Sequence, residues 1–209
     1  MEIKWLGHAC FSIKHKGYTV VIDPYNYKYT YGYPRLNLRA DKVLVSHEHY
    51  GHNCREAVTL SGKPESQCPF AISSFSVDHD TVGGRMRGTS LVHILEADGL
   101  KLVHMGDIGT KPTGEQSGQL FGADVMMVCA GSCTALPAQE VWRLSEELMP
   151  KVIIPMHYRF KNYGTRRLEH IEALTDLFDS PELIHSYDTD TIRIDGNTEP
   201  QVALLKYMG

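Results

Sequence analysis

Histidines gather in one short segment of the chain, directly after an apolar run. Of the 11 histidines, three lie in residues Ser46–His52, which read SHEHYGH and follow the apolar residues 42–45. Residues two apart in an extended chain point to the same side, so His47 and His49 can bind one ion together. A turn after them can bring His52 to a neighbouring ion. Neutral imidazole is the commonest metal ligand near pH 7, and this spacing therefore predicts a metal site.

Three further residues end apolar segments in the same way. His79 follows the apolar run 70–77, Asp107 follows the run 100–105, and His157 follows the segment 152–155. A single histidine at such a place is more often a surface or core residue than a ligand. In this order, after an H-x-H-x-x-H spacing, the three residues instead indicate one metal-binding constellation.

Such a constellation is suited to hydrolysis. A divalent ion lowers the pKa of a bound water from 15.7 to about 7, which gives hydroxide at neutral pH. Two ions ~3.5–4 Å apart can hold that hydroxide while they polarise a carbonyl or phosphoryl oxygen of the substrate. No Ser/His/Asp or Cys/His nucleophile motif competes with this interpretation, and Ser46 is better explained as a residue at a strand end.

The residues between these motifs predict mostly short strands. β-branched and apolar runs alternate with Gly, Pro, Asp and Asn, which favour turns. Gly17 and residues 97–99 are typical of hairpin turns. The expected strands cover residues 9–13, 19–22, 42–45, 70–77, 90–96, 100–105, 124–128, 152–155, 191–194 and 201–207.

Two segments show helical periodicity instead. Residues 137–149 carry an apolar stripe and begin with a proline, which suits a first helical turn. Residues 165–178 carry a second stripe, with Thr165 as the expected N-cap. The chain shows no linker, repeat or low-complexity tract. Strands with few helices in 209 residues predict one α+β (or mixed α/β) domain spanning residues 1–209.

The composition is that of an ordinary globular protein, 42% hydrophobic and 22% charged. A net charge of −4 argues against a general nucleic-acid or membrane-surface binder. Five cysteines without a zinc-finger spacing fit free thiols in a reducing compartment, and Cys129 and Cys133 are predicted to be small buried residues near a turn. Without a signal-peptide core or an apolar run of ~18 residues, we expect a cytoplasmic protein with no membrane or nucleic-acid partner.

These motifs together resemble the metallo-β-lactamase superfamily, and in particular its branch of small hydrolases similar to the ascorbate-phosphate lactonases. The resemblance runs nearly end to end. It implies a four-layer αββα sandwich in which loops at one edge of two sheets hold one or two metals. The matching segments are residues 5–11 (WLGHACF), 22–24 (IDP), 46–52, 79, 87–88, 106–109 (GDIG) and 155–158 (PMHY).

The resemblance also implies a ligand set. Zinc, as one or two ions, is the expected cofactor, with manganese or iron as alternatives. Asp107 and His157 are the expected catalytic residues. By position, His47, His49 and His79 would bind a first metal. His52 and His157 would bind a second, and Asp107 would bridge the two.

One position departs from the resemblance. The family motif is H-x-H-x-D-H, whereas this chain has Gly51 where the aspartate is expected. That aspartate binds or organises the second metal and can transfer protons, and glycine has no side chain for either task. Three ligands still suffice for zinc with an open position. A weakened two-metal site, a one-metal enzyme and an inactive relative all stay open. Glu48, Asp78 and Asp80 are candidate replacements for the missing carboxylate.

Weaker signals surround these motifs. His8 either lines the pocket or has a structural role. Arg85 and Arg87 offer planar donor groups for a phosphate or carboxylate, or form a solvated pair. Tyrosine at every second position from 25 to 33 would line one face of a strand. These tyrosines either pack in a surface loop or form a lid over the substrate.

The leading hypothesis is a metal-dependent hydrolase acting on an ester, lactone or phosphodiester bond of a small molecule. Phosphorylated and carboxylated substrates are included, and a homo-oligomer is left open. The alternative is a non-catalytic metal-binding protein, a scaffold or sensor, with a degenerate second site. A di-iron redox domain is disfavoured because such sites usually carry an extra carboxylate where hydrolases have histidine.

Overall fold

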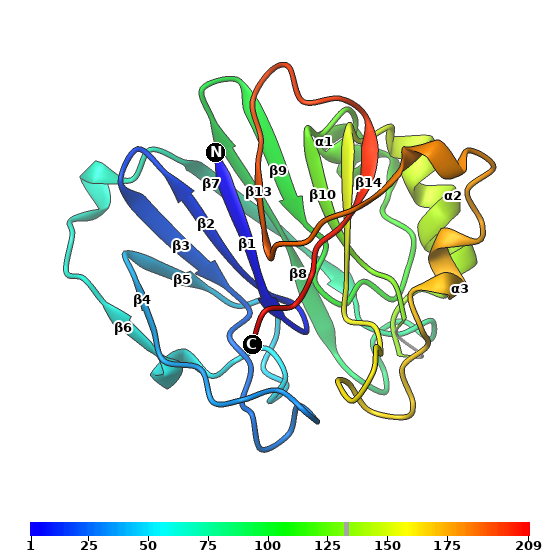
Figure 1. The fold of residues 1–209 in the computed structure, drawn as a ribbon, viewed down its shortest axis with the longest axis horizontal. Coiled ribbons are helices and arrows are strands. Elements are labelled where there is room, and N and C mark those ends of the chain that lie inside the picture. The colour runs from blue at the N-terminus through cyan, green and yellow to red at the C-terminus, as the bar shows by residue number, and fades with distance from the viewer. Residues whose placement is uncertain (132–133) are drawn as a thin grey trace.

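The computed structural model describes residues 1–131 and 134–209, which form two sheets packed face to face (Figure 1). The first sheet has five strands, antiparallel except for the parallel pair β3–β5. Gly17 lies in the turn between β2 and β3, as the sequence predicts. In spatial order the strands are β13 (Thr191–Arg193), β1 (Glu2–Gly7), β2 (Cys10–His15), β3 (Tyr18–Ile22) and β5 (Lys42–Leu44).

The second sheet has seven strands and is mixed. Its five strands from β12 to β9 run parallel to one another, whereas β8 is antiparallel to both of its neighbours. Every residue of β10 and β11 is buried, as expected for parallel strands covered on both faces. In spatial order the strands are β12 (Ile184–Ser186), β14 (Gln201–Leu204), β11 (Val152–Met156), β10 (Val125–Cys129), β9 (Leu100–His104), β8 (Thr89–Ala97) and β7 (Ala71–Asp78).

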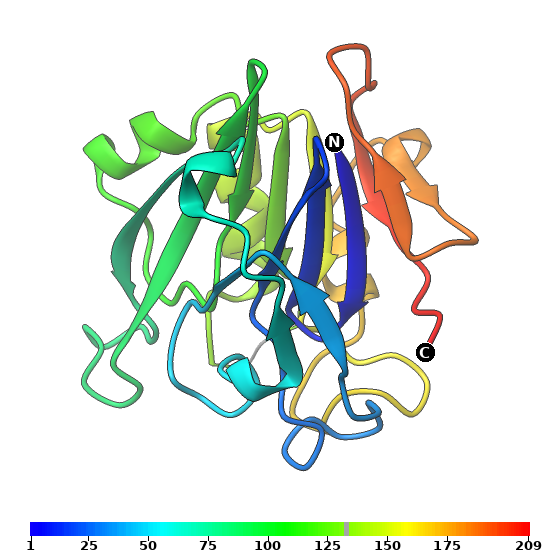
Figure 2. The same cartoon turned by 90° about the vertical axis from the view of Figure 1, so that its left-hand side faces the viewer.

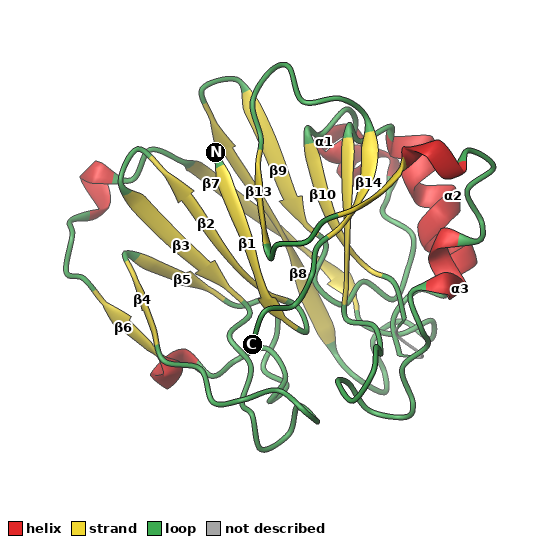
Figure 3. Ribbon diagram, in the orientation of Figure 1, coloured by secondary structure: helices red, strands yellow, loops and turns green. Residues whose placement is uncertain are grey.

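The outer faces of the two sheets are covered differently. Helices α2 (Ala138–Leu148) and α3 (Glu172–Thr175) lie outside the second sheet (Figure 3). On the other side, the described residues form a small two-stranded sheet and short 3-10 turns (Figure 2). The remaining elements are β4 (Leu38–Ala40), β6 (Val58–Leu60), α1 (Gly114–Leu120), and the 3-10 turns η1 (Arg55–Ala57), η2 (Glu65–Gln67) and η3 (Pro181–Leu183).

Alternation along the strands explains this layering. In β3, Val20 and Ile22 belong to the main core between the sheets, whereas Val21 points to the opposite face. There Val21 packs with Ala40 and Val58 of the two-stranded sheet in a second, smaller cluster. The predicted α+β sandwich is therefore confirmed, and each expected strand is present.

One predicted helix is wrong. Residues 165–178 were expected to be helical throughout, but α3 covers only Glu172–Thr175. In the first half of this segment the backbone pairs with distant residues: Glu169 N–H donates to Gly131 O at 2.8 Å, and Arg159 N–H donates to Glu169 O at 2.8 Å. These tertiary bonds pair backbone groups that an α-helix would otherwise have to pair within the segment.

No helix among residues 1–131 and 134–209 is long and apolar enough to cross a bilayer.

The main core depends on side chains between the two sheets. His104 Nε2, at the end of β9, bonds at 3.0 Å to Ala9 O in the turn that joins β1 and β2 of the first sheet, so that face of β9 points between the sheets. Leu102 shares this face because it lies two residues before His104, and it is fully buried.

We expect Leu102→Ala to lower the free energy of unfolding by about 2–5 kcal/mol, because it leaves a cavity in packed surroundings. The matched control is Leu60→Ala, whose side chain is largely exposed; it should change stability by no more than about 0.5 kcal/mol. Urea unfolding of the two metal-free variants measures the difference. Equal losses would contradict the placement of Leu102 between the sheets.

Candidate metal centre

The strand directions bring the six predicted ligands to one edge of the sandwich. Strands β5, β7, β9 and β11 all end at this edge, the lower edge in Figure 1, where the connecting loops gather. Each ligand follows one of these strand ends: His47, His49 and His52 follow β5, His79 follows β7, Asp107 follows β9, and His157 follows β11.

The carboxylate of Asp107 lies in the middle of this group. Its Oδ2 atom is 3.5 Å from both His52 Nε2 and His79 Nε2. The same atom is 3.8 Å from His157 Nε2 and 4.0 Å from His47 Nε2. Zinc ligands at about 2.0–2.1 Å in a tetrahedron are about 3.3 Å apart, so these spacings fit donors that surround metal ions.

The donor atoms form overlapping groups. The donor atoms of His47, His49 and His79 lie within 4.8 Å of one another, and so do those of His47, His52 and Asp107. Within the first group, His49 Nδ1 is 3.2 Å from His79 Nε2. The structure therefore brings all six predicted residues together, and none of them lies apart from the centre.

A buried carboxylate that the sequence analysis gave no role, Asp23, orients two of the histidines. Asp23 accepts hydrogen bonds from Ser46 N–H at 2.6 Å, Ser46 O–H at 2.6 Å and His52 Nδ1–H at 2.8 Å. Since the Ser46 hydroxyl donates to Asp23, it accepts from His47 Nδ1–H at 2.9 Å. Both imidazoles are thereby held in the tautomer whose Nε2 lone pair faces the centre.

A second orienting contact involves the thiol of Cys129 at the end of β10. Its Sγ is 3.2 Å from Asp107 Oδ1 and 3.1 Å from Gly106 O. This contact holds one carboxylate oxygen, so the other faces the histidines. Cys129 is buried, as predicted, but its contact with Asp107 was not foreseen, and Cys133 lies outside the described residues.

The protonation states suit a metal-binding site. Burial lowers the pKa of His47 to about 3, and burial also lowers the pKa of His49 and of His157. Burial of Asp107 would raise its pKa, but His157 and His52 beside it hold that pKa well below its usual value. Burial of His52 would lower its pKa, but Asp107 and Asp23 outweigh burial and raise it. An ionised carboxylate beside imidazoles whose pKa is lowered is a donor set that zinc and similar ions bind.

One buried nitrogen atom at the centre indicates whether these residues fit a metal ion. Among the described residues, His47 Nε2 is buried and has no hydrogen-bond partner. A buried, unpartnered polar atom costs about 1–3 kcal/mol, and a metal ion removes this cost when it accepts the lone pair. The residues present therefore fit a divalent cation.

Comparison with known proteins agrees with this geometry. A model of the β-lactamase superfamily domain matches residues 2–157. The chain belongs to this superfamily. A UPF0173 metal-dependent hydrolase of Methanopyrus kandleri is 26% identical over 200 residues, covering 76% of this chain and 84% of that protein. The chain is therefore a metal-dependent hydrolase of the metallo-β-lactamase superfamily.

Solved structures show the same relationship. A Thermotoga maritima protein, named as a Zn-dependent hydrolase of the metallo-β-lactamase superfamily, has a TM-score of 0.71 and 26% identity, covering 98% of this chain and 97% of that one. An isothiocyanate hydrolase from Delia radicum gut bacteria shares the fold, with a TM-score of 0.61, 14% identity, and coverage of 84% and 91%.

The prediction that Glu48, Asp78 or Asp80 replaces the carboxylate missing at Gly51 is wrong. Glu48 is exposed and pairs with Arg55 at 2.6 Å. Asp80 accepts backbone N–H groups of the loop at residues 82–87. Asp78 lies against Gly84, and none of the three lines the pocket over the metal centre.

That pocket has a volume of about 220 Å³, and its mouth is cationic. Arg87 lines it, as one interpretation of the sequence proposed, whereas Arg85 instead donates to Val82 O. Arg167 was not predicted as a site residue; it comes from the segment that was wrongly expected to be helical. Among the described residues, the guanidinium groups of Arg87 and Arg167 form no hydrogen bond or ion pair, so both are available to a ligand; Arg87 bonds to Asp80 only through its backbone N–H.

The alternating tyrosines form turns and irregular chain rather than a strand. Tyr25 and Tyr33 are buried, and the three tyrosines between them are exposed. Tyr29 lines the pocket and stacks on Tyr50 with ring centroids 4.2 Å apart. The segment therefore combines a packed surface loop with one wall of the pocket.

The hydrogen bonds of Asp23 predict that its contribution to the stability of this hydrolase depends on pH. Burial raises the pKa of Asp23, but His52 and Ser46 outweigh it and hold that pKa below its ordinary value. We expect Asp23→Asn to lower the free energy of unfolding of metal-free protein by about 3–5 kcal/mol, as when one partner of a buried pair is removed. Since ionised Asp23 stabilises the fold above its unfolded pKa of about 3.9, the difference from wild type should shrink as the pH falls below about 4.

Chemical unfolding from pH 3 to 8 measures this. The control is Asp98→Asn, which removes an exposed carboxylate paired with Lys16 and should change stability far less than Asp23→Asn, because exposed ion pairs contribute little. A loss in Asp23→Asn that stays the same at every pH would contradict the orienting role of the ionised carboxylate.

Proposed function

We propose that this hydrolase cleaves an ester, lactone or phosphodiester bond in a small molecule that carries a phosphate or carboxylate group. The observation that carries the proposal is the position of Asp107 Oδ2, which lies 3.5–4.0 Å from a nitrogen of four different histidines. Six convergent donors are more than one structural ion requires, and they leave room for a water and a substrate oxygen.

The donors sort into two neighbouring sites. We assign the first ion to the three residues His47, His49 and His79, and the second to His52 and His157, with Asp107 between them. Hydrolysis of an ester, a lactone or a phosphodiester has one requirement in common. In each, a substrate oxygen gains negative charge during attack, and this charge must be stabilised. A divalent cation held by these residues would supply Lewis acidity: it would lower the pKa of a bound water to about 7 and stabilise that charge.

The protein's own side chains prepare this chemistry. Ser46 and Asp23 fix the imidazoles of His47 and His52 in their binding tautomers, and Cys129 holds one oxygen of Asp107. Because these contacts are made before the substrate arrives, little reorganisation is needed during the reaction. Zinc is the metal we propose, since nitrogen donors outnumber oxygen donors at the site.

The pocket supports a small anionic substrate. Its volume of about 220 Å³ is below the range of about 300–1,000 Å³ typical of drug-sized ligands. Arg87 and Arg167 both line it, and a guanidinium presents a planar pair of donors that matches phosphate and carboxylate oxygens. We propose that these two arginines bind the charged group of the substrate while the metal centre acts on the scissile bond.

The test is hydrolysis of matched substrate pairs. Bis(4-nitrophenyl) phosphate, 4-nitrophenyl esters and γ-lactones are assayed with and without an anionic substituent. We expect a chelator to abolish activity, added zinc to restore it, and His47→Ala and Asp107→Ala each to lower kcat/KM by more than about 100-fold, the upper end for loss of an outer-sphere contact.

Arginine variants test the substrate class. Arg87→Met and Arg167→Met should lower kcat/KM about 10- to 100-fold for anionic substrates, the effect of losing a charged hydrogen bond, and leave neutral ones nearly unchanged. Arg85→Met and Arg166→Met are the controls, since both arginines are exposed and do not line the pocket. Chelator-resistant activity would contradict the metal mechanism, and equal effects on both substrate classes would contradict the anion-binding role.

A further inference from the structure

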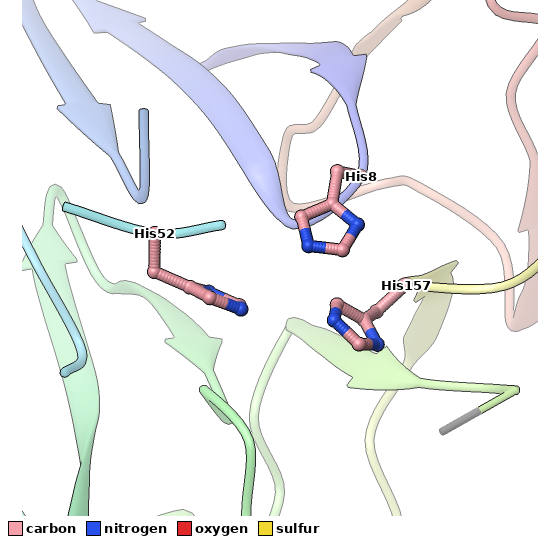
Figure 4. A group of neighbouring side chains, drawn as sticks. All are labelled: His8, His52 and His157. Atoms are coloured by element: carbon pink, nitrogen blue, oxygen red, sulfur yellow. The ribbon is translucent and has the colours of Figure 1, made fainter. Parts of the chain in front are cut away.

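His8 lies beside the ligands of the second site without being one of the expected set. It occupies the turn between β1 and β2 and exposes only 8% of its surface. The donor atoms of His8, His52 and His157 lie within 4.8 Å of one another. Figure 4 shows the three rings, from separate parts of the chain, facing one shared space. The ring of His8 is 4.0 Å from that of His157 between centroids.

Gly51 explains how His8 fits there. A Cβ atom built on Gly51 would lie 2.8 Å from His8 Nε2, a separation that real Cβ atoms essentially never show. The aspartate expected at position 51 and the imidazole of His8 would therefore compete for the same space. In this chain the small residue at 51 and the ring at position 8 are complementary.

The backbone holds the His8 ring toward the centre. His8 has a φ of 53°, in the left-handed region that costs a residue with a side chain conformational energy. Its carbonyl accepts hydrogen bonds from Trp5 Nε1 at 2.9 Å and from the backbone N–H of His157 at 3.1 Å. These two bonds tie the turn at His8 directly to the ligand His157, so the two rings are positioned as a unit.

Nothing else in the described part of the chain accounts for the imidazole. Neither ring nitrogen of His8 has a hydrogen-bond partner among the described residues, and Nδ1 is buried. Nε2 is the nitrogen on the side of Gly51, where the expected carboxylate is missing. A ligand held between His8, His52 and His157 would give this Nε2 atom a partner.

We propose that His8 is a ligand of the second metal ion, together with His52, His157 and Asp107, in place of the carboxylate that Gly51 lacks. This inference rests on the metal centre of the proposed function. Replacing a carboxylate with a neutral imidazole makes the occupied site one charge unit more positive. The exchange favours zinc or cobalt over oxygen-preferring manganese and magnesium, and it strengthens attraction for an anionic substrate.

The test is metal binding, measured without substrate. Apo-protein is titrated with Co²⁺, and the visible absorption bands report the coordination of each ion while a competing chelator gives the two affinities. Asn tolerates the left-handed backbone at position 8 and is too short to reach the Nε2 position, so His8→Asn is the variant. We expect it to weaken the second ion at least about 10-fold, the lower end for an outer-sphere contact, and to leave the first unchanged.

Variants at position 51 give a second test of the same proposal. Gly51→Asp alone should not strengthen the second ion, because His8 occupies the space. In the double variant, with His8→Asn, the new carboxylate has room and should restore binding, so the two substitutions are coupled. His93→Asn is the control; His93 is a buried histidine bonded to Ser74 Oγ at 2.7 Å and belongs to none of the donor groups of the centre, so both ions should bind as in wild type.

The results that would overturn this inference can be told apart from those that would overturn the proposed function. Unchanged second-ion affinity and spectrum in His8→Asn would overturn the inference, even if kcat fell, because His8 would then act on protons rather than on the metal. Wild-type protein that binds one ion and hydrolyses substrate would overturn it while leaving the proposed function intact, and protein that binds no ion would overturn both. If His8→Asn does not fold, crystals of the Co²⁺-loaded wild type decide: His8 Nε2 at about 2.0–2.1 Å from the ion supports ligation, and beyond about 3 Å overturns it.

Discussion

Two ionised carboxylates are buried at one edge of this sandwich, and the groups that face them are imidazoles. Asp23 and Asp107 expose 0% and 3% of their surfaces, and every ion-pair contact of either one among the described residues is with a histidine. A buried carboxylate costs several kcal/mol unless it is paired. A divalent cation beside Asp107 satisfies that requirement. The common direction of strands β5, β7, β9 and β11, the tautomers of the histidines and the two arginines that line the pocket all act on the same small volume.

The sequence was sufficient to predict which residues meet at this edge, because each one follows a strongly apolar strand. His79, Asp107 and His157 are separated by 28 and 50 residues in the chain, yet parallel strands place their carboxyl ends at one edge whatever the connections between them. The strands themselves were predictable from composition, since β10 and β11 are buried on both faces and read as continuous apolar runs. The weakly apolar strands β4, β6 and β12, with three residues each, gave no such pattern.

What the sequence could not predict depends on tertiary contacts. Residues 165–171 have helical periodicity, but hydrogen bonds to Gly131 and Arg159 hold their first part as a loop, and this loop brings Arg167 to the pocket. Likewise, Gly51 alone suggested a weakened site. Only the spatial relation between Gly51 and His8, 43 positions apart in the chain, shows that a donor already occupies the space of the missing side chain. Cys129 and Asp23 were visible as residues, but their contacts to Asp107 and His52 come from the packing of separate strands.

The central claim is that divalent cations compensate the Asp107 carboxylate at this edge. Anomalous diffraction at the absorption edge of the bound metal, from crystals of protein purified with zinc, tests it most directly. The account predicts a strong peak within about 2.0–2.2 Å of an Asp107 oxygen and of histidine nitrogens, the distances of zinc–ligand bonds. A protein that crystallises with the same fold but shows no anomalous peak within bonding distance of Asp107 would contradict it.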